Sequence, residues 1–146
     1  MKNILILAAL LLSAFSTQAL AFDFILEGKG VSRPGYENCN KALPQFEKLL
    51  QKTFVQILDK PRCVLDSNTA FVPEFKVLAS KPYVTRKIAG APFSSRSFCE
   101  IELQRMMKEN AKKSPILEGA CTTQDLDESL FKPELILLLS EGLNAE

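Results

Sequence analysis

The first apolar run of the chain is short and follows a single positive charge. Residues 4–12 read ILILAALLL after Lys2, and small and polar residues then lead to Ala19-Leu20-Ala21. A basic start, an apolar core and an A-x-A site are the three parts of a cleaved secretory signal peptide. An uncleaved anchor is less favoured, because spanning a bilayer takes roughly 20 apolar residues. We therefore expect a signal peptide over residues 1–21 and an exported chain over 22–146.

Four later segments have the alternation or the composition of β-strands. The first alternates apolar and polar residues, and the next two are rich in β-branched and aromatic residues and are separated by Lys81-Pro82. Pro73 has no amide hydrogen to donate, so we expect it on an edge strand or at the beginning of its strand. The run LILLL must be buried, and we favour a central strand over a short helix. The predicted strands cover residues 22–26, 70–80, 83–89 and 135–139.

The clearest helical period of the N-terminal half lies between Leu43 and Leu58. Apolar residues recur there every three or four positions, and charged or amide side chains occupy the opposite face. Proline is favourable in the first turn of a helix. We therefore expect the helix to begin at Pro44 and to be closed by Lys60-Pro61.

A second helix is predicted from Ser97 and Glu100, which have the spacing of a capping box. It should begin near Phe98 and stop before Pro115, and residues 119–129 should form a polar, acidic connection. Its buried stripe is expected to consist of Cys99, Leu103, Met106 and Met107. Its basic face is expected to consist of Arg105, Lys108 and Lys112, with Lys113 beside them.

The cysteine content indicates two structural disulfides. The chain has four cysteines, no C-x-x-C spacing and no histidine, which argues against a metal site. A helix that begins at Pro44 would let its flanking segments fold back and bring Cys39 to Cys63. A helix running unbroken from Cys39 would hold these two cysteines about 30 Å apart. Of the three possible pairings we therefore favour Cys39–Cys63 and Cys99–Cys121.

Charge is balanced overall but unevenly distributed. Lys2 is the only charged residue before Asp23, so 17 of the 18 basic residues remain after cleavage, against 17 acidic ones. Residues 75–113 carry 9 basic and 3 acidic side chains, and residues 114–146 carry 1 and 7. The acidic tail could neutralise the basic middle within the fold, or both could be solvated surfaces. Alternatively, the basic middle contacts an anionic partner.

The absence of histidine excludes histidine-based triads and dyads. Two carboxylates could still hydrolyse a glycoside, and Glu100 and Glu102 are candidates by proximity, although residues two apart on a helix face different directions. Asp125, Asp127 and Glu128 could offer oxygens to calcium. Their segment lacks the glycine and the distal glutamate of an EF-hand loop, so we interpret it as a solvated acidic loop.

Two further motifs have both a functional and a structural interpretation. Gly28 and Gly30 lack the third glycine or the Lys-Ser/Thr that would specify a phosphate loop, so we interpret them as ending the first strand. Cys99 lies near a predicted helix N-terminus and Arg96, which could make its thiol reactive. With three other cysteines in an exported chain, a disulfide is its expected state.

These patterns predict a single exported α+β domain over 22–146, in which a small, mainly antiparallel sheet packs against two amphipathic helices. No internal repeat is evident. We expect a periplasmic or secreted binding protein, either an envelope-assembly factor or an inhibitor, with no cofactor, no metal and no membrane span after cleavage. Its expected partner is another envelope or extracellular protein, or an anionic envelope component, rather than nucleic acid. A metal-free carboxylate hydrolase and a thiol-disulfide protein are the alternatives. The expected contact residues are Arg105, Lys108, Lys112 and Lys113.

Overall fold

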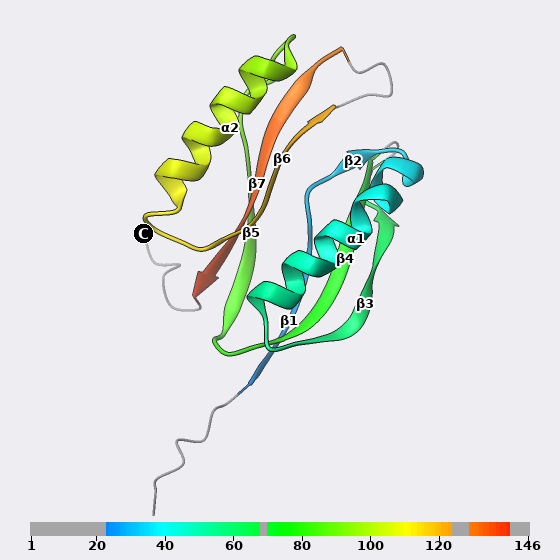
Figure 1. The fold of residues 1–146 in the computed structure, drawn as a ribbon, viewed down its shortest axis with the longest axis vertical. Helices are drawn as coiled ribbons and strands as arrows, with labels where there is room; N and C mark the ends of the chain where they lie inside the picture. The colour runs from blue at the N-terminus through cyan, green and yellow to red at the C-terminus, as the bar shows by residue number, and fades with distance from the viewer. Residues whose placement is uncertain (1–22, 68–69, 124–128, 141–146) are drawn as a thin grey trace, which may run out of the picture.

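Over the residues that the structure describes, the fold is α+β, as expected, with two helices and two antiparallel sheets (Figure 1). Two disulfides connect these elements. The computed structural model describes residues 23–67, 70–123 and 129–140. The predicted signal peptide and the acidic residues Asp125, Asp127 and Glu128 lie outside these ranges. In chain order the elements are β1 (Phe24–Lys29), β2 (Arg33–Pro34), α1 (Tyr36–Thr53), β3 (Gln56–Leu65), β4 (Ala70–Ala79), β5 (Tyr83–Ala89), α2 (Arg96–Asn110), β6 (Ile116–Thr123) and β7 (Phe131–Ser140).

Sheet A is built around β4. Strands β1 and β2 pair with one side of β4, and β3 pairs with the other, all antiparallel. Pro73 therefore lies inside a central strand, and the expected edge or initial position is wrong. Its carbonyl accepts a hydrogen bond from the Gly30 amide at 2.8 Å, so its backbone faces the gap between β1 and β2. A missing amide hydrogen costs no ladder hydrogen bond there.

Sheet B is built around β7, with β5 and β6 at its edges. The prediction of a central strand over residues 135–139 is confirmed, and Leu135 to Leu138 are buried. The predicted connection from Gly119 is wrong for residues 119–123, which belong to β6. A Cβ atom at Gly119 would lie 2.7 Å from Leu135 Cδ2. The glycine therefore permits close approach of two strands instead of marking a turn.

Helix α1 begins at Tyr36, so the predicted start at Pro44 is wrong. Cys39, Phe46 and Leu50 are buried on one face of this helix. Their burial outweighs the single backbone hydrogen bond that a proline inside the helix cannot donate. The helix also ends early, at Thr53, and Lys60-Pro61 lies within β3.

Both predicted disulfides are present, each with its Cα atoms 6.0 Å apart. The first forms by a route different from the one expected. From Cys39 to Thr53 the helix rises about 21 Å, and from Gln56 to Cys63 strand β3 returns about 23 Å alongside it. The cysteines therefore meet because helix and strand cover equal lengths in opposite directions.

Helix α2 begins at Arg96, after the N-cap residue Ser95, and no side chain caps its first amides. The predicted capping box of Ser97 and Glu100 is therefore wrong. Ser97 already lies in the first turn, and Glu100 pairs instead with Arg96. The predicted buried stripe is confirmed for Cys99, Leu103 and Met106, whereas Met107 is half-buried.

The two halves of the chain repeat one arrangement, so the expectation that there is no internal repeat is wrong. Unit 1 is β1–α1–β3–β4 with the short β2, and unit 2 is β5–α2–β6–β7. In each unit a helix cysteine bonds to a strand cysteine that lies opposite a proline of the central strand. The central strands share the pattern F-x-P-E-x-x-x-L-x-S over residues 71–80 and 131–140. Most other positions differ, which conceals the repeat in the sequence.

The main core lies where the two units meet. In unit 1, the inner face of β4 with Phe75 and Val77 packs against α1. The face of β7 that carries Ile136 and Leu138 also packs into this core, together with Leu117 of β6. Helix α2 covers the opposite face of β7 (Figure 1). Sheet B is therefore covered on both faces, whereas sheet A has one outer face.

Candidate functional site

A groove lies between helix α1 and strand β6, at the junction of the two units. This α1–β6 groove has a volume of about 570 Å³. Strand β6 is an edge strand of sheet B, and no other described strand pairs with its outer side. The groove therefore combines a helix wall with an unpaired strand edge. It is lined by Ala42, Lys48, Leu49 and Lys52 of α1, by Met107 of α2 and by residues 116–120 of β6.

A largely buried ion pair, Arg33–Glu118, lines this groove. Glu118 of β6 accepts a hydrogen bond from the Val31 amide at 2.6 Å and a second from the Arg33 guanidinium. The two side chains of the ion pair are only 10% and 17% exposed, for Glu118 and Arg33 respectively. Gly30 allows this approach, because a Cβ atom there would lie 2.6 Å from a Glu118 carboxylate oxygen.

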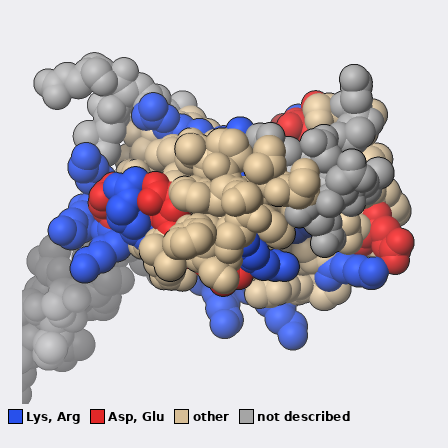
Figure 2. All heavy atoms as spheres, turned by 90° about the horizontal axis from the view of Figure 1, so that it is seen from above, with Lys and Arg blue, Asp and Glu red and all other residues tan. Residues whose placement is uncertain are grey.

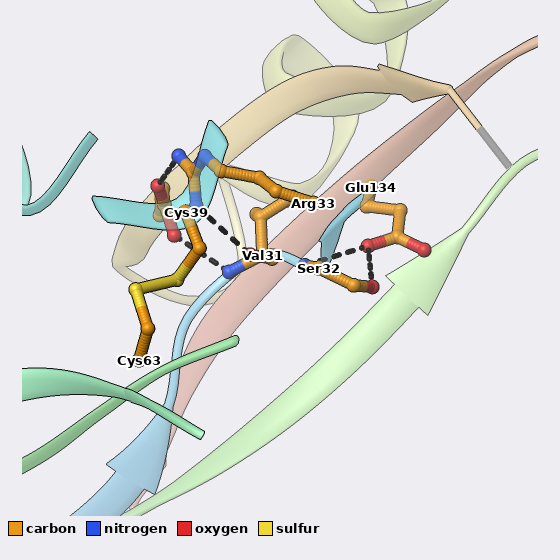
Figure 3. A network of polar contacts seen from close by, with 7 residues as sticks. Val31, Ser32, Arg33, Cys39, Cys63 and Glu134 are labelled. Atoms are coloured by element: carbon orange, nitrogen blue, oxygen red, sulfur yellow. Dashed lines mark hydrogen bonds and ion pairs between the residues drawn. A yellow bond between two sulfur atoms is a disulfide. The ribbon is translucent and has the colours of Figure 1, made fainter. Parts of the chain in front are cut away.

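A second buried carboxylate holds the same loop from the other side. Glu134 of β7 accepts hydrogen bonds from the Ser32 amide at 3.3 Å and from the Ser32 hydroxyl at 2.9 Å. Lys87 lies 3.2 Å from Glu134 and donates to the Ser32 hydroxyl at 2.7 Å. Figure 3 shows Ser32 turned toward Glu134 and Arg33 turned away from it, beside the Cys39–Cys63 bridge. These acids tie unit 1 to unit 2 as hydrogen-bond acceptors.

Glu100 and Glu102, the carboxylates considered for hydrolysis, pair with different arginines. Glu100 lies 3.3 Å from Arg96, and Glu102 accepts from Arg105 at 2.8 Å. The hydrogen bond from Arg105 lowers the pKa of Glu102, and the pKa of Arg105 is raised by Glu102 and Glu109. Each carboxylate is therefore engaged in a separate local ion pair on the helix surface.

On the predicted basic face of α2, part of the positive charge is neutralised by ion pairs that the sequence analysis did not predict. Arg105 is held between Glu102 and Glu109, at i−3 and i+4. Lys108 is exposed at the last turn of α2, whereas Lys112 and Lys113 follow the end of the helix. Figure 2 looks down on the molecule as drawn in Figure 1, and on this face several basic side chains gather at the left with acidic side chains among them, while others lie along the lower and right margins.

Two apolar residues on the outer surface of α2 were not anticipated. Phe98 is 63% exposed and Ile101 is 66% exposed. They stand at i and i+3, so they share one face, and Arg105 continues it at i+7. The signal in the sequence was an apolar i, i+3 pair outside the predicted stripe.

The outer face of sheet A has a charged hollow of about 740 Å³. Three ion pairs cross or border it: Lys29–Asp66, Arg62–Glu74 and Lys76–Glu27. The hydrogen bond with Glu27 raises the pKa of Lys76. Gly28 lines this hollow inside β1, while Gly30 follows the end of the strand at Lys29. Only Gly30 therefore ends the strand as expected.

The cysteines and the metal-binding groups give no further site. All four cysteines are in disulfides, and Cys99 is fully buried. Among the residues that the structure describes, no cluster of three His, Cys, Asp or Glu side chains could hold a metal ion. No helix within the same residues has the length and apolar character to cross a membrane.

The α1–β6 groove is the candidate site that combines a cavity with the free edge of a strand, and sequence reasoning missed it. No short stretch of sequence predicts a groove between elements some 70 residues apart. The repeat at 71–80 and 131–140 could, however, have indicated that β6 is an edge strand. Comparison with known proteins identifies no relative: no family model, no curated protein and no solved structure matches the chain.

Proposed function

We propose that the chain is an exported binding protein without catalytic activity, which recognises another envelope or extracellular protein through the α1–β6 groove. The observation that carries this proposal is the unpaired edge of β6 beside the wall of α1. Exposed strand edges are ready sites for pairing with another chain. The signal-like residues 1–21 and the two disulfides support an oxidising compartment outside the cytosol.

The alternative functions have weaker support. A carboxylate hydrolase needs two acids that converge on a cleft. Glu118 and Glu134 already accept hydrogen bonds from the loop between β1 and β2, and Glu100 and Glu102 pair with separate arginines. A thiol-disulfide protein needs a reactive thiol. All four cysteines are in bridges, and in each bridge one cysteine, Cys39 or Cys99, is fully buried while its partner is half-buried.

The proposal is tested by recovering the partner with matched charge reversals. Wild type, K48E/K52E and K108E/K112E are immobilised and exposed to an envelope extract of the producing cell. Each variant reverses two exposed lysines that have no salt bridge with any described residue. We expect wild type and K108E/K112E to recover the same partner and K48E/K52E to recover roughly a tenth as much.

Two results would contradict this proposal. Loss of the partner from K108E/K112E alone would place the contact on the Arg105, Lys108, Lys112 and Lys113 surface, which remains a separate prediction. Recovery of no specific partner by wild type would contradict the binding role itself. Circular dichroism of all three proteins controls for folding.

A further inference from the structure

Along the outer edge of β6, the backbone groups of two residues have no partner among the residues that the structure describes. The Gly90 amide donates to the Pro133 carbonyl at 2.9 Å, so Pro133 faces β5. Backbone groups alternate in direction along a strand, so the even-numbered residues of β7 face β6. Their antiparallel partners are Glu118, Ala120 and Thr122. Gly119 and Cys121 therefore direct their N–H and C=O groups away from β7, toward the outer edge.

The two sides of the groove differ in chemistry. On the α2 side lie Met107 and Ile116, which pack with the core under α2. On the α1 side lie Lys48 and Lys52, one turn apart and both exposed, with Leu49 between them. A strand laid along β6 would direct alternate side chains to these two sides. One set would meet apolar atoms and the other would meet ammonium groups.

The fixed charges of the groove leave a positive excess. Arg33 and Glu118, which both line the groove, neutralise each other. Lys48 and Lys52 have no acidic partner among the described residues, and no other acidic residue lines the groove. An acidic segment would pair with these two lysines, whereas a basic segment would be repelled by them.

We propose that the α1–β6 groove binds an extended segment of a partner protein in which acidic and apolar residues alternate, added as a further strand to the outer edge of β6. The ladder hydrogen bonds go to Gly119 and Cys121. The apolar side chains pack on Met107 and Ile116, and the acidic ones pair with Lys48 and Lys52. This inference rests on the proposed binding function and specifies the chemistry of the partner.

The test uses three labelled peptides as long as β6, eight residues, in which Val alternates with Glu, with Thr or with Lys. Fluorescence anisotropy at low salt gives the affinities for wild type, K48E/K52E and K108E/K112E. We expect the Glu peptide to bind wild type roughly tenfold more tightly than the Thr peptide, because two exposed ion pairs each contribute up to about 1 kcal/mol. This preference should vanish in K48E/K52E and persist in K108E/K112E.

Amide exchange measured by NMR supplies the second readout. The Glu peptide should protect the Gly119 and Cys121 amides and leave the Glu118 and Ala120 amides unchanged. Equal binding of all three peptides, or binding without this protection, would overturn the inference. If a partner is recovered through Lys48 and Lys52 while the peptides give no protection, the strand-addition mode is wrong and the binding function stands. If wild type recovers no partner, the binding function itself fails.

Discussion

At the scale of single residues, Glu118 and Glu134 determine how the two units are joined. Their side chains are only 10% and 6% exposed, and each accepts a hydrogen bond from a backbone amide of the loop between β1 and β2. Each also forms an ion pair, Glu118 with Arg33 and Glu134 with Lys87. A buried carboxylate is tolerated only when it is paired and hydrogen-bonded in this way. Their acceptor capacity is used inside the protein, which is why they act as structural groups.

The substitution Glu118→Gln tests this role. The carboxylate accepts from two donors, Val31 N–H and the Arg33 guanidinium. A carboxamide has one acceptor oxygen, so it would set its own NH₂ group against one of these donors and leave Arg33 without a counter-charge. We expect the free energy of unfolding to fall by about 2 to 4 kcal/mol, measured by urea titration.

The matched control is Glu74→Gln, which removes a charge from an exposed ion pair with Arg62. Its expected effect is within about 0.5 kcal/mol of wild type. Equal changes in the free energy of unfolding for the two substitutions would show that the Glu118–Arg33 pair contributes no more to stability than an exposed ion pair.

At the scale of elements, local composition predicted the type of most elements, whereas contacts set their boundaries. The strand over 83–89 and the central strand over 135–139 follow from β-branched, aromatic and aliphatic runs. The start of α1 does not follow from local composition, because the burial of Cys39 against β3 extends the helix upstream of a proline. The acids Glu118 and Glu134 were likewise unpredictable, since their loop partners are 87 and 102 residues away.

The two disulfides connect equivalent elements and should stabilise the fold equally. Each ties a helix to the strand that follows it, across 24 residues in unit 1 and 22 in unit 2. Similar loop lengths restrict the unfolded chain to a similar degree. We expect C39A/C63A and C99A/C121A each to lower the free energy of unfolding by about 3 kcal/mol, measured by urea titration without reductant.

The comparison between these two variants is the sharper part of this prediction. Values that agree within about 1 kcal/mol would fit the chain-entropy account. A variant that loses no stability would show that its bridge is absent from the folded protein in solution.

At the scale of the whole molecule, the two units differ in what covers the second face of the central strand. The β7 face with Ile136 and Leu138 is buried against unit 1, and the equivalent positions of β4 are Lys76 and Leu78 on the outer face of sheet A. Charged residues on that outer face prevent it from taking up a third layer. The repeat is therefore built from two units of different surface chemistry.

Because the main core contains residues of both units, we expect the whole chain to unfold in one transition. The sequence supplies a probe for each unit, since it has no tryptophan and two tyrosines, Tyr36 in unit 1 and Tyr83 in unit 2. Tyrosine fluorescence of the variants Y83F and Y36F reports the two units separately during urea unfolding. The two midpoints should coincide.

Separate midpoints, with one unit unfolding at a lower urea concentration, would contradict a shared core. Far-ultraviolet circular dichroism of both variants gives the control, because it follows α1 and α2 together. Its midpoint should match the fluorescence midpoint of each variant.

Each bridge joins a cysteine to the next one along the chain, Cys39 to Cys63 and Cys99 to Cys121. In any oxidising compartment that the polypeptide enters N-terminus first, the thiols of unit 1 arrive together while those of unit 2 are still in transit. Oxidation in order of arrival then gives the native pairs directly. We therefore expect the native pairs to form without an isomerase that corrects mispaired intermediates.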